Sequence, residues 1–333
     1  MIYHYRIKVV YFVLGLLSIL GGLAGCDALA NTFVKPLPTE TSIALTDTPS
    51  LMITLRIVSD TPFATNTVNP TPTVRPSDTP ANLPEPTPTE GCSSQQGQIV
   101  PQQITSEAMG HPLEFNIYLP PCYDTRVIGG YPVLYMLHGQ TFNQDQWIRL
   151  GLTAEADQLI TSGDILPFII VMPYEKDTWA NPFTSGFEPA LTDELIPWID
   201  QNYNTCALRQ CRAIGGLSRG GAWAIHLGFV EWKLFGAIGG HSPVPFEGDT
   251  PHLVSWQAKI PAGELPQIYL DMGQNDPFLQ YSEEFNDQLV KLGIPHEWLI
   301  QPGNHAEAYW QSHVIDYLRW YASFFKSQRD KSG

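Results

Sequence analysis

At residues 211–229 the chain reads CRAIGGLSRGGAWAIHLGF, and this stretch carries a strong structural signal. Residues 212–217 are typical of a short buried strand, whereas 221–229 are apolar over a length that favours a helix. A Gly-x-Ser-x-Gly sequence centred on Ser218 joins the two. Its small glycines let the strand and the helix approach closely, and the strained turn lifts the serine hydroxyl above the sheet. The stretch therefore predicts a nucleophile elbow with Ser218 as the nucleophile.

Strands and helices alternate on both sides of this turn. Residues 98–105 and 113–119 read as an antiparallel hairpin, and 131–137 and 165–172 are continuous apolar runs, as buried parallel strands require. A hairpin followed by strand–helix alternation predicts an α/β sandwich with helices on both faces of a mostly parallel central sheet. Further strands are expected at 212–217, 235–239, 267–272 and 296–300, and helices at 153–161, 191–201, 221–229, 282–292 and 310–325.

The loop after the strand at 267–272 should carry the acid of a catalytic triad, because ligands of such sheets bind outside the carboxyl ends of the strands. Two aspartates compete for this role. Asp271 stands at the end of the strand, where a carboxylate usually bonds to backbone or to a neighbouring loop. Asp276 lies in the loop, three residues after Gly273, and can turn toward the serine. We favour Asp276 and keep Asp271 as the alternative.

Three histidines follow the acid. His296 begins the last strand and so lies at the amino edge of the sheet, while His313 falls within the last predicted helix. His305 follows the last strand at the carboxyl edge, where it can take the Ser218 proton while Asp276 fixes its tautomer. Because the order Ser–Asp–His along the chain is that of α/β-hydrolases, we predict an α/β-hydrolase sandwich.

The tetrahedral intermediate of such a triad needs backbone N–H donors for its oxyanion. One donor is expected from Arg219, which directly follows the nucleophile. The other is expected from Gln140, in the loop after the strand at 131–137, where Gly139 lets the chain approach closely. His138 could be mistaken for a base, but we assign it to structural support of this loop.

Six segments are distinctive when taken together: YPVLYMLHG followed by Trp147, LPFIIVMPY, ELIPWIDQNY, CRAIGGLSRGG, LDMGQND and PGNHAEAYW. They resemble the esterase D-type group of α/β-hydrolases over nearly all of residues 95–326. This group includes feruloyl and acetyl-xylan esterases, enterochelin esterases, S-formylglutathione hydrolases and mycolyltransferases, and the likeness is strongest to bacterial feruloyl esterase domains. Such domains usually carry Met or another apolar residue where this chain has Arg219. A cation there could favour an anionic acyl or leaving group, or it could pair with a local acid.

The resemblance implies a serine carboxylic-ester hydrolase that acts through an acyl-enzyme, with no cofactor and no metal. The expected substrate is a feruloyl- or acetyl-type ester of a polysaccharide or of a small molecule. Two alternatives stay open. An acyltransferase of the same family would use a sugar hydroxyl in place of water. A non-catalytic cell-envelope binding module would have lost a triad member, and this sequence retains all three.

Aromatic residues near the predicted cleft are candidates for a wall that binds a sugar or a phenol. They are Trp147, Trp179, Phe183 and Phe187, and the alternative for each is ordinary packing of loops. His241 follows the strand at 235–239 and is expected to be a neighbour of the substrate rather than a base.

The first ninety residues differ in composition from the rest. Residues 1–26 have a basic start followed by an uncharged apolar run, which is typical of a secretory signal. The run ends in Leu-Ala-Gly-Cys26, which resembles a bacterial lipobox and implies a lipid on the Cys26 thiol; a single membrane-spanning helix is the alternative. Residues 27–90 hold eleven prolines and fourteen threonines, so we expect a disordered linker there. The esterase domain is then expected at 91–333.

Composition excludes some classes of protein. Only 15% of the residues are charged and 43% are hydrophobic, so the chain as a whole cannot be disordered. The net charge of −15 argues against a nucleic-acid partner, because binding a phosphate backbone needs an excess of Lys and Arg. The expected partners are the ester substrate and, through the lipid anchor, a membrane on its extracytoplasmic side.

Four cysteines remain if Cys26 carries a lipid, and an exported protein meets an oxidising compartment. Cys206 and Cys211 flank a short loop, so a local bridge between them is feasible. Cys92 precedes the first hairpin strand and Cys122 follows the second, which places them side by side in an antiparallel pair. Pairing these neighbours is the most economical of the three possible connectivities.

Overall fold

The computed structural model describes residues 92–332 apart from residue 262. The predicted signal segment with the lipidated Cys26, and the predicted linker at 27–90, lie outside the described residues. None of the helices in the described part is long and apolar enough to cross a membrane.

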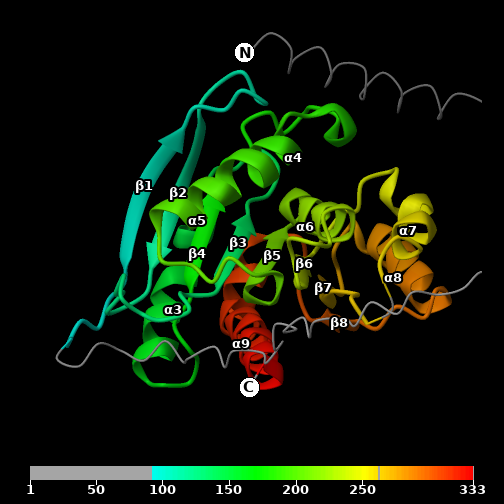
Figure 1. Cartoon of the computed structure of the whole chain (residues 1–333). Helices are drawn as coiled ribbons and strands as arrows, with labels where there is room; N and C mark the ends of the chain where they lie inside the picture. The colour runs from blue at the N-terminus through cyan, green and yellow to red at the C-terminus, as the bar shows by residue number, and fades with distance from the viewer. Residues whose placement is uncertain (1–91, 262, 333) are drawn as a thin grey trace, which may run out of the picture. The chain divides into compact units, whose positions relative to one another are not determined.

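A single sheet of eight strands forms the centre of this part of the chain (Figure 1). Its strands are β1 (Gln98–Ile104), β2 (Leu113–Leu119), β3 (Val133–Leu137), β4 (Ile169–Pro173), β5 (Arg212–Leu217), β6 (Ala237–His241), β7 (Gln267–Gly273) and β8 (Glu297–Gln301). Their order across the sheet is β1-β2-β4-β3-β5-β6-β7-β8. The pairs β1–β2 and β2–β4 are antiparallel, and all other neighbours are parallel. The prediction of a mostly parallel sheet with an N-terminal hairpin is therefore confirmed.

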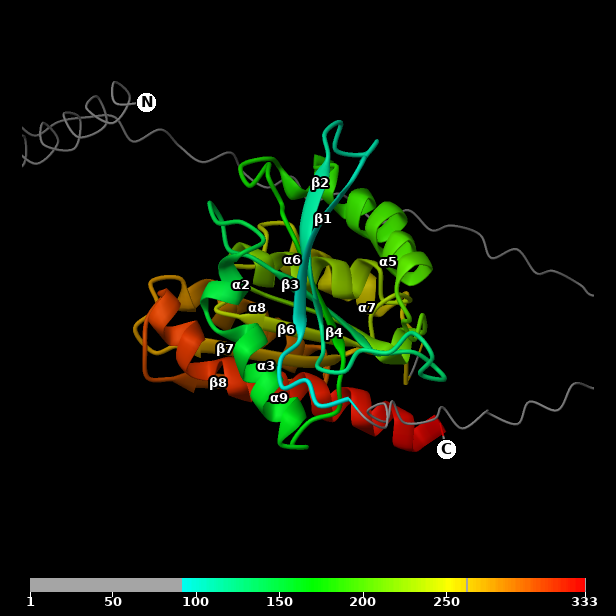
Figure 2. The same cartoon turned by 90° about the vertical axis from the view of Figure 1, so that its left-hand side faces the viewer.

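Helices cover both faces of the sheet, as Figure 2 shows. The α-helices are α2 (Gln146–Arg149), α3 (Leu152–Thr161), α4 (Phe187–Pro189), α5 (Ile196–Asn202), α6 (Arg219–Val230), α7 (Asp249–Gln257), α8 (Leu279–Lys291) and α9 (Glu307–Ser332). A π-helical segment, η2 (Ala190–Leu195), joins α4 to α5, and the short 3₁₀ segments are η1 (Pro182–Thr184) and η3 (Arg209–Cys211). One hydrophobic core lies under α4, α5, α6, α7 and α8, and a second lies under α2, α3 and α9.

The central strands are continuous apolar runs because helices bury both of their faces. Every residue of β3, β5 and β6 is buried. The edge strands β1 and β8 are instead partly exposed along their length. Because β5, β6, β7 and β8 are parallel neighbours, the loops that follow them meet at one edge of the sheet. This edge is where the predicted triad residues should converge.

Two disulfides, Cys92–Cys122 and Cys206–Cys211, confirm the predicted pairing. The first joins the segment before β1 to the segment after β2. Three of the described α-helices were not predicted, the short α2 and α4 and the longer α7. The sequence of α7, DTPHLVSWQ, contains a proline, and of its three large apolar residues Leu253 and Trp256 are buried and Val254 is exposed. This apolar spacing is too sparse to signal a helix.

Candidate active site

Ser218 lies between β5 and α6 with φ of 53° and ψ of −119°, a conformation that residues other than glycine rarely adopt. Its backbone N–H donates to the His241 carbonyl, 2.9 Å away on the neighbouring strand. The glycines on either side are required by space. A Cβ atom on Gly216 would lie 2.4 Å from the carbonyl carbon of Gly220, and one on Gly220 would lie 2.3 Å from the carbonyl oxygen of Leu137. The predicted tight turn is therefore present, with the serine at its apex.

The three predicted triad residues lie within hydrogen-bond distance of one another. His305 Nε2 is 2.9 Å from Ser218 Oγ, and His305 Nδ1 is 2.7 Å from Asp276 Oδ2. The carboxylate can only accept, so the ring carries a proton on Nδ1 and leaves Nε2 to accept from the serine hydroxyl. The Asp276 side chain is fully buried, whereas the His305 side chain keeps some contact with solvent.

Neighbouring residues hold the acid and the base in place. The backbone N–H of Phe278 donates to Asp276 Oδ1 at 2.9 Å, which orients the carboxylate. The backbone N–H of Asn275 donates to the Gly303 carbonyl, and this bond joins the acid loop to the histidine loop. The rings of Phe278 and Trp310 stand edge-on to the His305 ring at 4.9 and 5.1 Å. These contacts limit the directions that the imidazole can take.

The two predicted oxyanion donors are backbone N–H groups. Gln140 lies in the loop after β3, and Arg219 directly follows the nucleophile. Arg219 is the first residue of α6, so its N–H has no acceptor one turn earlier in the helix. The N–H of Gln140 makes no hydrogen bond to the described residues. Stabilisation of an oxyanion requires N–H groups that are free to donate, so both remain the predicted donors of an oxyanion hole.

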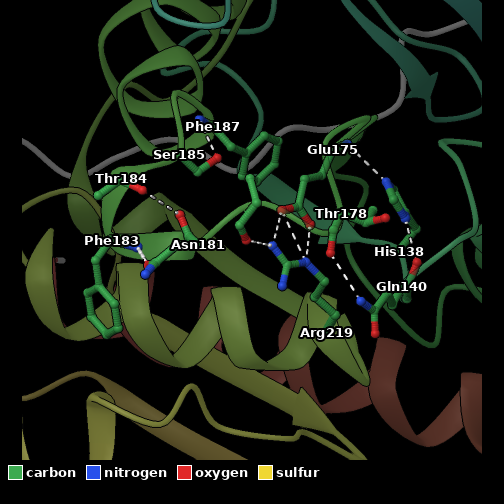
Figure 3. A network of polar contacts seen from close by, with 12 residues as sticks. His138, Gln140, Glu175, Thr178, Asn181, Phe183, Thr184, Ser185, Phe187 and Arg219 are labelled. Atoms are coloured by element: carbon green, nitrogen blue, oxygen red, sulfur yellow. Dashed lines mark hydrogen bonds and ion pairs between the residues drawn. The ribbon is translucent and has the colours of Figure 1, made fainter.

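Arg219 does not present a free cation to the site, because it pairs with Glu175 (Figure 3). Its Nε lies 2.9 Å from Glu175 Oε2 and its Nη2 lies 2.6 Å from Glu175 Oε1, so the pair is bidentate. Nη2 also donates to the Ala180 carbonyl, and the guanidinium packs over the rings of Trp223 and Phe246. Burial raises the pKa of Glu175, and the ion pair with Arg219 opposes that rise. Of the two roles that the sequence left open for Arg219, the structure shows pairing with a local acid.

The structure places three of the predicted substrate neighbours inside the protein, which corrects the prediction for these residues. Trp147 is 1% exposed, and its Nε1–H donates to the Leu137 carbonyl. His241 is 0% exposed, and its ring bonds to Asp271 and Tyr321 in the interior. Phe187 is also buried. These rings pack in the interior and so offer no surface for a substrate.

Trp179 and Phe183 lie differently, on the segment that follows β4. Trp179 is 80% exposed, and Phe183 is 47% exposed with its edge toward His226. The carbonyl of Thr178, directly before Trp179, accepts a hydrogen bond from the Gln140 side chain at 3.1 Å. Trp179 is therefore adjacent in sequence to a residue that contacts the loop after β3.

Asp271, the alternative acid, is sealed in the core. Its Oδ2 accepts hydrogen bonds from the hydroxyls of Tyr309 (2.6 Å) and Tyr317 (2.9 Å). Its Oδ1 lies 2.8 Å from His241 Nδ1, and His241 Nε2 lies 3.0 Å from the Tyr321 hydroxyl. All carboxylate partners of Asp271 are thus interior groups.

A third buried pair was not singled out from the sequence. His226 on α6 bonds through Nδ1 to Asp249 on α7 at 2.8 Å, and its Nε2 lies 3.5 Å from Glu188 on α4. Burial by itself lowers the pKa of His226, but the two carboxylates outweigh it and raise the pKa to about 9. The charged imidazole therefore ties α6 to α7 and α4. A histidine inside an apolar helix run gives no local sign of such partners.

Within the part of the chain that the structure describes, no three His, Cys, Asp or Glu side chains are grouped so as to hold a metal ion. His296 and His313 also stand outside the triad. His296 bonds to the Ile294 carbonyl before β8, and His313 lies on α9 beside Asp316.

Known proteins are similar to this chain across the region that holds these residues. A family model described as "Putative esterase" matches residues 106–321. An endo-1,4-β-xylanase/feruloyl esterase of Xylanibacter ruminicola is 38% identical over 173 residues, which cover 46% of this chain and 23% of that protein. An esterase of Mycobacterium tuberculosis is 27% identical over 256 residues, which cover 61% of this chain and 54% of that protein. The chain thus spans about a quarter to a half of the length of these curated relatives.

A solved structure of a ferulic acid esterase has a TM-score of 0.62 to this one, with 23% sequence identity. The match covers 69% of this chain and 99% of that chain. A serine hydrolase of Staphylococcus aureus that binds fluorophosphonate has a TM-score of 0.59 at 18% identity, covering 68% and 99% of the two chains. At these levels of identity the likeness shows a shared fold, which is that of the α/β-hydrolase esterases.

Proposed function

This chain belongs to the esterase family whose model spans residues 106–321, and from that membership we propose that it is a serine hydrolase of carboxylic esters. The observation that carries the proposal is the 2.9 Å distance between Ser218 Oγ and His305 Nε2, with Asp276 bonded to the other ring nitrogen. A hydroxyl, an imidazole and a carboxylate in this order activate a serine for attack on an ester carbonyl.

In the first half of the proposed reaction, Ser218 Oγ attacks the carbonyl carbon of the ester while His305 Nε2 takes the hydroxyl proton. Asp276 stabilises the imidazolium that forms. The carbonyl oxygen becomes an anion and accepts hydrogen bonds from the backbone N–H groups of Gln140 and Arg219. The bond to the alcohol then breaks, the imidazolium protonates the leaving oxygen, and the acyl group remains on Ser218.

In the second half, a water molecule attacks the acyl-enzyme and His305 takes one of its protons. The tetrahedral intermediate uses the same two N–H donors. Its collapse releases the carboxylic acid and returns the proton to Ser218. No step in this scheme uses a metal or a cofactor.

The proposed substrate is a feruloyl- or acetyl-type ester of a polysaccharide or a small molecule. The xylanase/feruloyl esterase relative supports this class. The exposed ring of Trp179 follows Thr178, whose carbonyl contacts the side chain of Gln140, and it offers an apolar surface for a phenol or a sugar. Because Glu175 neutralises Arg219, we expect no preference for an anionic acyl group.

The nucleophile is tested by replacing it. We expect Ser218→Ala to lose nearly all hydrolysis of p-nitrophenyl acetate and all labelling by a fluorophosphonate probe, with an unchanged melting temperature. Loss of a triad member typically costs on the order of 10⁴ to 10⁶ in kcat. Ser255→Ala, at an exposed serine on α7, is the matched control and should behave as the wild type. Probe labelling that persists in Ser218→Ala would refute the assignment.

The substrate class is tested by a panel of p-nitrophenyl acetate, butyrate and a longer-chain ester together with methyl ferulate. Product analysis with an added alcohol acceptor separates hydrolysis from acyl transfer. Free acid as the main product supports a hydrolase, whereas a new ester of the added alcohol in excess of the acid would make the protein an acyltransferase.

We further propose that the protein is exported and held at a membrane surface by a lipid on Cys26. Leu-Ala-Gly-Cys26 supports this, and so do the two disulfides, which fit an oxidising compartment. In a bacterial host fed a fatty-acid analogue, the wild-type protein should be labelled and Cys26→Ser should not be. Equal labelling of both proteins would contradict the anchor while leaving the esterase proposal intact.

A further inference from the structure

His138 makes a hydrogen bond at each ring nitrogen, and both partners belong to the backbone (Figure 3). Its Nδ1 lies 2.8 Å from the Gly139 carbonyl oxygen, and its Nε2 lies 2.9 Å from the Glu175 backbone nitrogen. A backbone N–H can only donate, so Nε2 accepts that bond. The ring proton of the neutral imidazole is therefore on Nδ1, and it is donated to the Gly139 carbonyl.

The surroundings of His138 keep its ring in this neutral form. Burial lowers the pKa of His138 to about 4; the bond to Gly139 opposes the shift and the positive charge of Arg219 adds to it. Arg219 is the charged group that acts on the ring, and its guanidinium pairs with the Glu175 carboxylate. At neutral pH the imidazole therefore has a single proton, which is committed to one acceptor.

The Gly139 carbonyl belongs to the same peptide group as the Gln140 N–H. The described residues contain no cis peptide bond, so this carbonyl and this N–H point in opposite directions. The bond from His138 therefore also sets the direction of the Gln140 N–H. The next residue, Thr141, has φ of 69°, which is costly for a side chain with a branched Cβ. Two donors hold the Gly139 carbonyl: His138 at 2.8 Å and the Phe142 N–H at 3.2 Å.

Glu175 connects the two N–H donors that flank Ser218. Its carboxylate holds the guanidinium of Arg219, the residue whose backbone supplies one donor. Its backbone N–H holds His138, which orients the peptide group of the other donor, Gln140. His138 and Glu175 are each 3% exposed and the Arg219 side chain is 12% exposed, so bulk water competes little for the bonds between them.

We propose that His138 is a positioning residue of the oxyanion hole, and that the Arg219–Glu175 pair holds it against the Gly139 carbonyl. Without that bond only the longer contact from the Phe142 N–H restrains the Gly139–Gln140 peptide group, so the group can turn and the transition state loses one donor. The inference rests on the proposed ester hydrolysis, and it adds a role for three side chains that do not touch the substrate.

Two substitutions of similar size distinguish the roles of the two ring nitrogens of His138. The amide nitrogen of His138→Asn takes the place of Nδ1 and can still donate to the Gly139 carbonyl. The amide oxygen of His138→Gln takes the place of Nε2 and can still accept from Glu175, but this side chain places no donor at Gly139. Both variants are polar and uncharged, so a general loss of packing should affect them alike.

We expect His138→Gln to lower kcat by about 10²-fold with KM changed by less than about threefold, because loss of one oxyanion donor acts on the transition state. His138→Asn should retain kcat within about tenfold of the wild type. A trifluoromethyl ketone, which adds to the Ser218 oxygen to give a tetrahedral oxyanion while His305 takes the proton, provides a second measurement. Its inhibition constant should rise in His138→Gln by about the same factor as kcat falls.

Equal kcat values for the Asn and Gln variants would overturn the proposal, as would an increase in KM alone. Ser218→Ala, measured alongside, separates this inference from the proposed function. If Ser218→Ala abolishes hydrolysis but His138→Gln has wild-type kcat, only the role of His138 is wrong. If Ser218→Ala remains active, the ester hydrolase mechanism itself fails.

Discussion

Two histidine–aspartate pairs lie near the carboxyl edge of the sheet, and their bonds are almost identical in length. His305 Nδ1 is 2.7 Å from Asp276, and His241 Nδ1 is 2.8 Å from Asp271. The difference lies at the other ring nitrogen. That of His305 faces the Ser218 hydroxyl in a partly exposed position, whereas that of His241 faces the Tyr321 hydroxyl in a sealed one.

The comparison shows that an imidazole–carboxylate bond does not define a catalytic pair. A general base must reach both the nucleophile and the substrate, so it needs an open Nε2 at the surface. A buried pair whose remaining atoms all bond to tyrosines instead stabilises the fold, because every polar group in it has a partner. His241 and Asp271 join β6 and β7 to α9 in this way.

The largest expected difference between the pairs is in catalysis. Asp276→Asn should lower kcat by roughly 10⁴-fold, because the amide no longer fixes the His305 tautomer that accepts the Ser218 proton. Its oxygen can still accept the Phe278 N–H, so the fold should persist. Asp271→Asn should lower kcat by less than about tenfold, measured per folded molecule. Reversed kinetic effects would make Asp271 the catalytic acid.

A smaller difference is expected in the free energy of unfolding, and here replacement of Asp271 should have the greater effect. Asp271→Asn should lower the free energy of unfolding by about 3–5 kcal/mol in urea titrations, because it breaks a buried charged network with three donors. Tyr309→Phe removes only one of these donors and should cost about 1.5–3 kcal/mol. If Asp276→Asn proves as destabilising as Asp271→Asn, the division into a catalytic and a structural pair is wrong.

The smallest expected effect is a dependence of the free energy of unfolding on pH. It comes from the third pair, His226–Asp249. The pKa of His226 is raised to about 9, so the folded protein binds this proton more tightly than the unfolded chain does. The resulting stabilisation is complete below about pH 6.5 and is lost as the pH rises through about 9.

Burial raises the pKa of Asp249 as well, and the bond to His226 opposes that rise. The free energy of unfolding should therefore fall between pH 6.5 and 9.5 in the wild type. In His226→Gln, the matched control, the same titration should be nearly flat. An identical decline in both proteins would show that another group is responsible.

Local sequence patterns were enough to predict those parts of the structure whose conformation depends on residues nearby in the chain. Strand β5 occupies the predicted residues 212–217, and the turn at Ser218 follows because only glycine fits on either side of it. The two disulfides follow from the positions of the cysteines at the ends of a hairpin and of a short loop. Parallel strand order then accounts for why the loops carrying Asp276 and His305 meet near the serine.

Side-chain surroundings were not predictable in this way, because they depend on segments far apart in the chain. From the sequence, Trp147 and His241 were expected near the substrate because each follows a buried strand. In the structure, residues of helix α9 pack against them, and its tyrosines donate hydrogen bonds to Asp271. The partner of Arg219 is Glu175, 44 positions away, which only the packing of the loop after β4 against α6 brings into contact. Whether a polar group at the sheet edge serves catalysis or the core is decided by what packs against it, because burial removes water and leaves only the partners that the tertiary structure supplies.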